Sequence, residues 1–213
     1  LLLGYDFANT INILMPVSIV VSFLQFARSK INDKKFIIEY NFFCLPFLAI
    51  FLLLALNYRY VVDFKFFVAL LLIFSSLLIL NKRRFSSLRE KFFQFKKFML
   101  IIIGTIHGFT NMGGSFLSIY STLISKNKKE LARYYISYGY LIMGIIQYFI
   151  VLFISFESLN FSKIYYAMIA ILIYLPSQKI FNNINDKSFS KYINFIALLY
   201  GIFIISSYVV NLE

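Results

Sequence analysis

Six apolar stretches of the chain are each long enough to cross a lipid bilayer as a helix. Because a helix rises about 1.5 Å per residue, the ~30 Å hydrocarbon core needs about 20 predominantly apolar residues. The stretches are 10–27, 37–56, 62–80, 134–154, 163–181 and 192–210. Of the 213 residues, 61% are hydrophobic and only 14% are charged, which is too apolar for a water-soluble domain of this size. The sequence therefore predicts an all-α polytopic membrane protein.

A further apolar segment, residues 98–125, carries four glycines and a run of small polar residues in its middle. Residues 104–115 read Gly-Thr-Ile-His-Gly-Phe-Thr-Asn-Met-Gly-Gly-Ser. A membrane helix satisfies its own backbone, so glycines that loosen it at depth are tolerated where the opened backbone lines a cavity or contacts a ligand. We therefore predict two half-helices, near 98–108 and 112–125, that meet at a binding site. The segment either crosses once, tilted, or enters and returns as a re-entrant element.

The charge of the connections favours the re-entrant alternative. Lys and Arg accumulate in short cytoplasmic loops of membrane proteins. Four connections are basic, namely 28–35, 81–97, 126–133 and 179–191, whereas 57–63 and 155–163 each pair one basic with one acidic residue. A re-entrant element puts every basic connection on one side, while a full crossing separates 81–97 from 126–133. We expect a multi-pass protein of the cell (inner) membrane with its basic loops cytoplasmic.

The same topology divides the chain into two inverted repeats. Residues 1–80 form the first repeat with three crossings, 81–97 form a basic cytoplasmic linker, and 98–213 form the second repeat, a re-entrant or broken helix followed by three crossings. Inverted repeats with helices broken at the midplane are common in secondary transporters, with the substrate between the halves. By symmetry, a first re-entrant element is expected upstream of Leu1. The chain is therefore expected to be truncated at its N-terminus.

Backbone amides at the start of the second half-helix predict a site for an anion. Gly113 and Gly114 leave free N–H groups at the positive end of a helix dipole. Neighbouring hydroxyl, amide and imidazole groups add hydrogen bonds. The expected substrate-binding residues are Gly104, Thr105, His107, Gly108, Thr110, Asn111, Gly113, Gly114, Ser115, Asn12 and Ser137.

Several of these residues also have a purely structural interpretation. Gly104 and Gly108 form a small-xxx-small pattern, which allows two helices to pack closely. The buried polar residues Asn12, Ser137 and Gln147 either line the pathway or form interhelical hydrogen bonds. We favour a site role for Asn12 and Ser137, because the symmetry places their helix starts beside the glycines.

The glycine-rich segment resembles that of the sulfite exporter TauE/SafE permeases, also called the toluene-sulfonate uptake (TSUP) family. Its members carry Gly-x-x-x-Gly-Phe-x-Gly-x-Gly-Gly-x-Phe, followed by an alanine at the start of the next helix. The matching positions are Gly104, Gly108, Phe109, Gly113, Gly114, Phe116 and Ala132, and Ala8 and Asn12 match the helix start of the first half. Asn111 stands where a glycine is usual. The resemblance spans essentially the whole chain and implies alternating-access transport of small organic or inorganic anions of the sulfite, sulfonate and sulfoacetate class.

Other classes of function fit the sequence less well. The formal net charge of +12 comes from short clusters between apolar segments, so nucleic acid is not an expected partner. The interior of the crossings holds no Asp, Glu, Lys or Arg, whereas an embedded enzyme normally needs paired acids, several histidines or a nucleophile with a base. Cys44 is the only cysteine, and no metal or cofactor is expected. The alternative to a permease is a non-transporting scaffold or assembly subunit.

Coupling and assembly are predicted only in outline. Proton-coupled transporters often hold an ionisable group at depth. His107 is the only histidine, and it either carries a proton or contacts the anion, or it simply hydrogen-bonds a backbone carbonyl. The expected partners are thus a small anionic substrate, a coupling proton or cation, the lipid bilayer and a second copy of the chain in a homo-oligomer.

Overall fold

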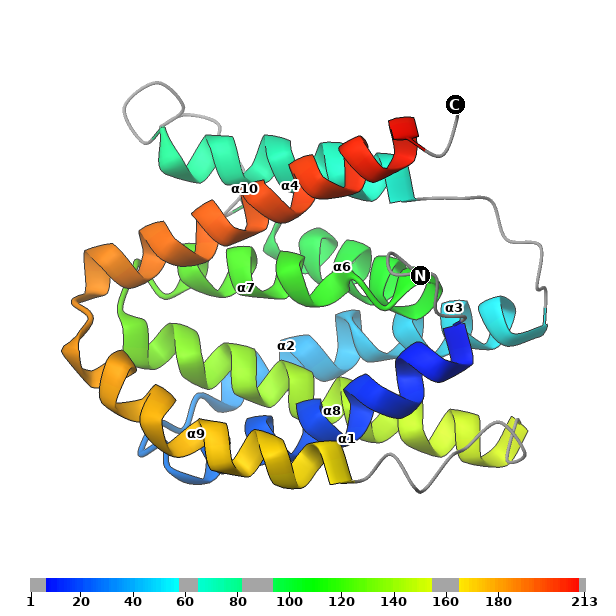
Figure 1. Cartoon of the computed structure of the whole chain (residues 1–213), viewed down its shortest axis with the longest axis horizontal. Helices are drawn as coiled ribbons and strands as arrows, with labels where there is room; N and C mark the ends of the chain where they lie inside the picture. The colour runs from blue at the N-terminus through cyan, green and yellow to red at the C-terminus, as the bar shows by residue number, and fades with distance from the viewer. Residues whose placement is uncertain (1–6, 58–64, 82–93, 155–164, 211–213) are drawn as a thin grey trace.

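All regular elements in the described part of the chain are α-helices (Figure 1). The computed structural model describes residues 7–57, 65–81, 94–154 and 165–210. The helices are α1 (Phe7–Ala27), α2 (Lys34–Phe43), α3 (Leu45–Asn57), α4 (Lys65–Leu80), α6 (Lys96–Thr110), α7 (Gly113–Ile124), α8 (Lys129–Ile154), α9 (Tyr165–Asn183) and α10 (Asp186–Val210). The predicted all-α class is confirmed.

Three helices of the described residues are long and apolar enough to cross a bilayer. They are Lys34–Asn57, which joins α2 to α3, Lys129–Ile154 and Asp186–Ser207. α1 and α4 contribute shorter apolar helices, Leu14–Ala27 and Val68–Leu77. α9 is at the predicted position of a crossing, but polar residues in its last two turns, including Gln178 and Lys179, lower its hydropathy. These helices indicate a membrane location.

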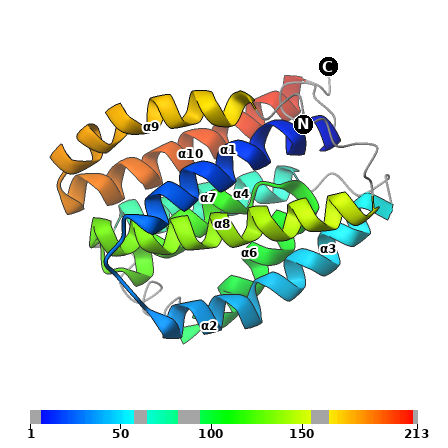
Figure 2. The same ribbon diagram turned by 90° about the horizontal axis from the view of Figure 1, so that it is seen from below.

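α7 and α8 lie in the middle of the molecule, as the two perpendicular views show (Figures 1 and 2). α4 packs against α10, α1 packs against α8 and α9, and α3 packs against α6 and α8. The buried side chains of α2, α6, α7 and α8 form one core, centred on large residues such as Tyr40, Leu100, Leu117 and Tyr134. This core supports the segment in which the sequence predicted a break.

The helix break falls at Asn111 and Met112, between α6 and α7. Asn111 has a left-handed backbone conformation with φ of 56°, and its N–H donates to the His107 carbonyl at 2.9 Å. Asparagine tolerates this conformation better than most residues. α7 then turns back alongside α6, since a Cβ on Gly113 would lie 2.7 Å from the Ile103 carbonyl oxygen. The observed helices, 96–110 and 113–124, lie close to the predicted half-helices.

Asp33 ties the loop between α1 and α2 to the start of α8. Its carboxylate caps α2 by accepting from the Phe36 N–H at 3.0 Å, and it accepts from the Tyr135 hydroxyl at 2.7 Å. Partial burial raises the pKa of Asp33, but these hydrogen bonds and the charge of Lys35 outweigh it and lower the pKa below the ordinary value of 3.8. The ionised carboxylate therefore stabilises this corner of the fold.

Replacement of Asp33 is expected to make stability less dependent on acid pH. Because the folded-state pKa is lowered, the contribution is complete above the unfolded-state pKa and is lost as pH falls through the folded-state value. Asp33→Asn keeps a capping side chain without the charge, so we expect the free energy of unfolding to fall by about 0.5–1 kcal/mol at pH 7. This difference should shrink as the pH falls through the folded-state pKa. Denaturant unfolding of wild type and variant in detergent, at neutral pH and over a series of acid pH values, measures it. A difference in unfolding free energy that stays the same at every pH would contradict this role.

Candidate functional site

A cavity of about 530 Å³ opens beside the helix break, between α1, α8 and α10. Its floor is the break itself, and its walls come from helices that are far apart in the sequence. The cavity is lined by Ser18, His107, Asn111, Met112, Gly114, Ser115, Ser118, Tyr140, Gly144, Gln147 and Tyr200, and by the apolar residues Leu14, Met15, Val17, Ile193, Ile196 and Ala197. The break therefore faces open space rather than packed side chains.

The first turn of α7 reaches the cavity without a side-chain cap. An α-helix leaves the amides of its first turn without intrahelical partners. The N-cap position, Met112, makes no side-chain hydrogen bond, and its own N–H donates to the Thr110 hydroxyl at 3.2 Å. Gly114 and Ser115, in the first turn, both line the cavity. The positive end of the α7 dipole is thus directed at this space.

Three polar side chains form a hydrogen-bonded chain along the cavity wall. His107 Nε2 lies 3.2 Å from Gln147 Oε1, and Gln147 Nε2 donates to Asn111 Oδ1 at 3.3 Å. With these amide orientations, His107 carries its proton on Nε2, and the Asn111 NH₂ group remains a donor. His107 is 4% exposed, and its Nδ1 has no partner among the described residues. Buried polar atoms without a partner are rare in folded proteins, so this one has room for a bound water or ligand as its partner.

The polar part of the lining is rich in neutral hydrogen-bond donors. Among the described residues that line the cavity, none is Lys, Arg, Asp or Glu. The donors are the amides of the first turn of α7, the Asn111 amide and the hydroxyls of Ser18, Ser115, Tyr140 and Tyr200. The rest of the lining from α1 and α10 is apolar. Such a site suits a small solute with one charged or strongly polar end and an apolar remainder.

Four of the predicted site residues line the cavity: His107, Asn111, Gly114 and Ser115. Gly113 is packed against α6, and the Thr110 hydroxyl donates to the Ile106 carbonyl at 2.7 Å. The remaining residues do not line it. Thr105 is half-buried outside the cavity, and Gly104 and Gly108 face the backbone of α3 or of its junction with α2. 

Ser137 and Asn12 are the two predicted site residues outside the glycine-rich segment. Ser137 is buried in α8, where its hydroxyl donates to the Tyr134 carbonyl at 3.0 Å, and it does not line the cavity. Asn12 lies in α1, but its side chain is outside the part of the structure that is described. A site role for Asn12 therefore stays a prediction.

The sequence analysis left the role of Gln147 open and did not identify Tyr140 or Tyr200 as site residues. Gln147 connects His107 to Asn111, and Tyr140 lies against Gly114, close enough that a Cβ at that position would overlap its ring. Gln147 stood out in the sequence only as one of several polar residues within a crossing. Its i,i+7 relation to Tyr140 was the available signal, since such residues share one helix face.

No protein-family model, curated protein or solved structure matches the chain. Within the described residues, no group of three or more His, Cys, Asp or Glu is placed to hold a metal ion.

Proposed function

We propose that this chain is a membrane permease for small anions, and that the anion binds in the cavity at the start of α7. One observation carries the proposal: an uncapped helix N-terminus faces a cavity whose polar lining consists of neutral donors. The N-terminus of a helix attracts anions through its free N–H groups and its dipole. Neutral donors give an anion hydrogen bonds without holding it so tightly that release becomes slow. The resemblance to TauE/SafE permeases supports the same class.

The shape of the cavity favours an organic anion with a compact oxyanion head. A sulfonate or carboxylate accepts several hydrogen bonds and fits the donors around Asn111 and Ser115. The apolar wall, which includes Met15 and Ile196, suits a short hydrocarbon portion. We therefore place sulfonates and sulfoacetate ahead of sulfite within the proposed sulfur-containing class.

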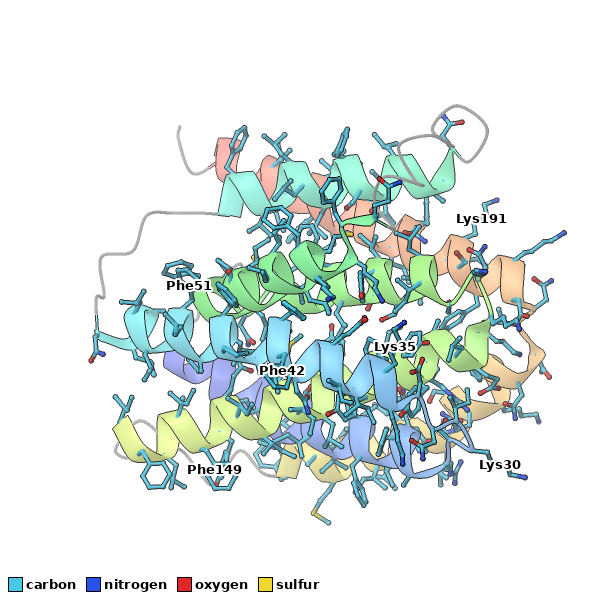
Figure 3. All side chains as sticks on the ribbon, turned by 180° about the vertical axis from the view of Figure 1, so that it is seen from behind. Lys30, Lys35, Phe42, Phe51, Phe149 and Lys191 are labelled. Carbon is cyan, nitrogen blue, oxygen red and sulfur yellow. The ribbon has the colours of Figure 1, made fainter. Side chains whose placement is uncertain are left out.

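We further propose that α6 and α7 form a re-entrant element, with the basic loops cytoplasmic in the cell (inner) membrane. The reversal of direction at Asn111 supports this, because α7 returns toward the end at which α6 begins (Figure 1). Lys30 and Lys191 lie toward one end of the molecule, and Phe51 and Phe149 lie toward the other (Figure 3). The location of both lysines at one end agrees with the positive-inside rule.

The helix contacts support the proposed inverted repeat. If α1 is exchanged with α8, α2 and α3 with α9, and α4 with α10, the α1–α8 and α4–α10 contacts map onto themselves. The α1–α9 contact maps onto the contact between α8 and α3. α1 also runs opposite to α8, and α4 runs opposite to α10 (Figure 1). Opposite directions and exchangeable contacts are expected when a two-fold axis lies in the membrane plane.

Cysteine accessibility is expected to report one membrane face for Asn81 and Lys128, which flank the proposed re-entrant element. Both positions are exposed, and Cys44, the native cysteine, is buried and serves as an unreactive background. An impermeant maleimide should label Asn81→Cys and Lys128→Cys only from the inside of right-side-out vesicles after permeabilisation. Labelling of the two positions from opposite sides would show that 98–125 crosses the bilayer once.

Transport is tested by the uptake of labelled sulfite, sulfoacetate and taurine into proteoliposomes that contain the purified chain. We expect saturable uptake of at least one of these solutes and competition by the others. Empty liposomes and liposomes with heat-inactivated protein are the controls. A folded protein that moves none of these solutes, nor small carboxylates, would instead support the scaffold or assembly-subunit alternative.

His107→Gln is expected to remove the pH dependence of transport. The amide retains a hydrogen-bonding group next to Gln147 but, unlike an imidazole, cannot gain a proton as the pH falls. Initial uptake rates from about pH 7.5 down to about pH 4, for wild type and variant in parallel, measure the effect. A variant with the full wild-type pH profile would exclude this imidazole as the proton carrier. Transport would then be coupled to another cation or to no ion.

A further inference from the structure

A second cavity lies at the basic end of the molecule, separate from the start of α7. It measures about 460 Å³ and forms where α4 ends, the α7–α8 turn passes and α10 begins. Its described lining includes four lysines, Lys126, Lys128, Lys187 and Lys191, with Asp186 as the only acid. Lys191 lies at the end of the molecule opposite to Phe51 (Figure 3). The cavity is therefore strongly cationic.

The neighbouring side chains of Lys129 and Arg133 form hydrogen bonds or an ion pair, whereas those of the four cavity lysines form neither with the described residues. Lys129 Nζ donates to carbonyls at the end of α9, the shortest contact being 2.6 Å to Ile184, and Arg133 pairs with Glu130 at 2.7 Å. Asp186 accepts from the Lys129 N–H at 3.2 Å. Within the described residues, no ion pair includes any of the four cavity lysines. Their charge is available to a ligand.

Asn194, which lines this cavity, has a side-chain oxygen that accepts no hydrogen bond from the described residues. The residue is 0% exposed and lines the cavity. Its Nδ2 donates to the Ser190 carbonyl at 2.6 Å, but its Oδ1 has no partner among the described residues. Leaving a buried polar atom unsatisfied costs free energy. The oxygen suits a ligand that carries a hydroxyl group.

Four side chains of α10 form a stripe along one side of the helix, starting at this cavity. Lys187, Lys191, Phe195 and Leu199 follow one another at spacings of four residues, which places them on the same side of the helix. Phe195 is 48% exposed and Leu199 is 50% exposed. The stripe thus passes from two cations at the cavity to apolar side chains toward the bilayer interior. This order matches a phospholipid, whose charged headgroup is followed by acyl chains.

We infer that this cavity binds the headgroup of an anionic glycerophospholipid. The phosphate lies among the four lysines, a hydroxyl of the headgroup donates to Asn194 Oδ1, and an acyl chain lies along Phe195 and Leu199. A soluble phosphate ester shares the headgroup chemistry, but it would leave the apolar part of the stripe without a role. The inference rests on the membrane location of the chain and not on transport at the start of α7.

Lipid occupancy measured by native mass spectrometry tests the site. Purified protein in detergent is titrated with phosphatidylglycerol, phosphatidylcholine or phosphatidylmethanol, which is anionic but has no headgroup hydroxyl. We expect wild type to bind phosphatidylglycerol at least tenfold more tightly than phosphatidylcholine, and more tightly than phosphatidylmethanol. Lys187→Gln/Lys191→Gln should weaken phosphatidylglycerol binding by about tenfold.

The matched control removes two charges from the same end of the molecule but outside the cavity. Lys30→Gln/Lys34→Gln should change the affinity by less than about twofold, because both lysines are exposed and neither lines the cavity. Equal losses in the two double variants, or equal binding of phosphatidylglycerol and phosphatidylcholine by wild type, would overturn the site. Displacement of the lipid by an equal concentration of glycerol 3-phosphate would identify a soluble ester as the ligand and also overturn it.

Discussion

Asn111→Asp is expected to abolish anion binding while the protein stays folded. The two side chains have the same shape, a carboxylate still accepts from Gln147 Nε2, and aspartate also tolerates the left-handed backbone at this position. The variant, however, replaces a donor at the cavity with a negative charge. Two like charges about 4 Å apart repel by about 4 kcal/mol at an effective dielectric constant near 20, which corresponds to roughly a thousandfold loss of affinity.

Two measurements separate this electrostatic effect from a structural one. Asn111→Gly keeps the left-handed conformation and removes the amide, so it should weaken binding by only about tenfold to a hundredfold, the value of a hydrogen bond to a charged group. Binding by Asn111→Asp should recover as the pH falls and the new carboxylate becomes protonated. Isothermal titration of sulfoacetate at neutral and acid pH, with a thermal-unfolding control, provides both comparisons. Wild-type affinity in Asn111→Asp would place the anion elsewhere.

The elements of the fold that depend on local composition were predictable from the sequence. The apolar stretches gave helices at the expected positions, and the glycine-rich segment gave a break within a few residues of the predicted one. Asn111 was notable as a departure from a glycine motif. Its φ of 56° suits this residue type, because asparagine adopts the left-handed conformation more readily than most residues other than glycine. The turn therefore carries an amide side chain.

The walls of the cavity were not predictable, because they depend on which helices become neighbours. Gln147 and Tyr140 gain their position from the packing of α8 against α7, and Tyr200 gains its position from α10. The i,i+7 spacing of Tyr140 and Gln147 puts both side chains on one face of α8, but the α8 sequence does not specify which helix that face meets. The role of Gly104 and Gly108 could not be assigned from the sequence for a related reason. A small-xxx-small pattern occurs both where two helices pack closely and where a helix unwinds.

Gly104→Ala is expected to destabilise the fold while transport per folded molecule stays unchanged. A Cβ at this position would overlap the Cys44 carbonyl oxygen and lie 3.2 Å from the Leu48 N, so its neighbours are backbone atoms at the α2–α3 junction. Backbone cannot rotate away as a side chain can, and α6 must therefore move off α3. Overpacking of this kind costs about 1–3 kcal/mol. Gly108→Ala should behave similarly, because its Cβ would lie 2.6 Å from the Leu48 carbonyl oxygen.

Gly144→Ala is the matched control, because its added methyl group would meet only a flexible side chain. The nearest atom is Ile19 Cγ1 at 2.8 Å, and a change of rotamer can relieve the contact. We expect a stability loss below about 1 kcal/mol there, although the new methyl group narrows the cavity that Gly144 lines.

Reversible unfolding in mixed micelles and uptake per folded molecule, measured on the same preparations, should show opposite patterns for the two variants. Gly104→Ala should lose stability and retain uptake, whereas Gly144→Ala should retain stability and lose uptake. Loss of uptake by stable Gly104→Ala protein would instead return Gly104 to the binding site.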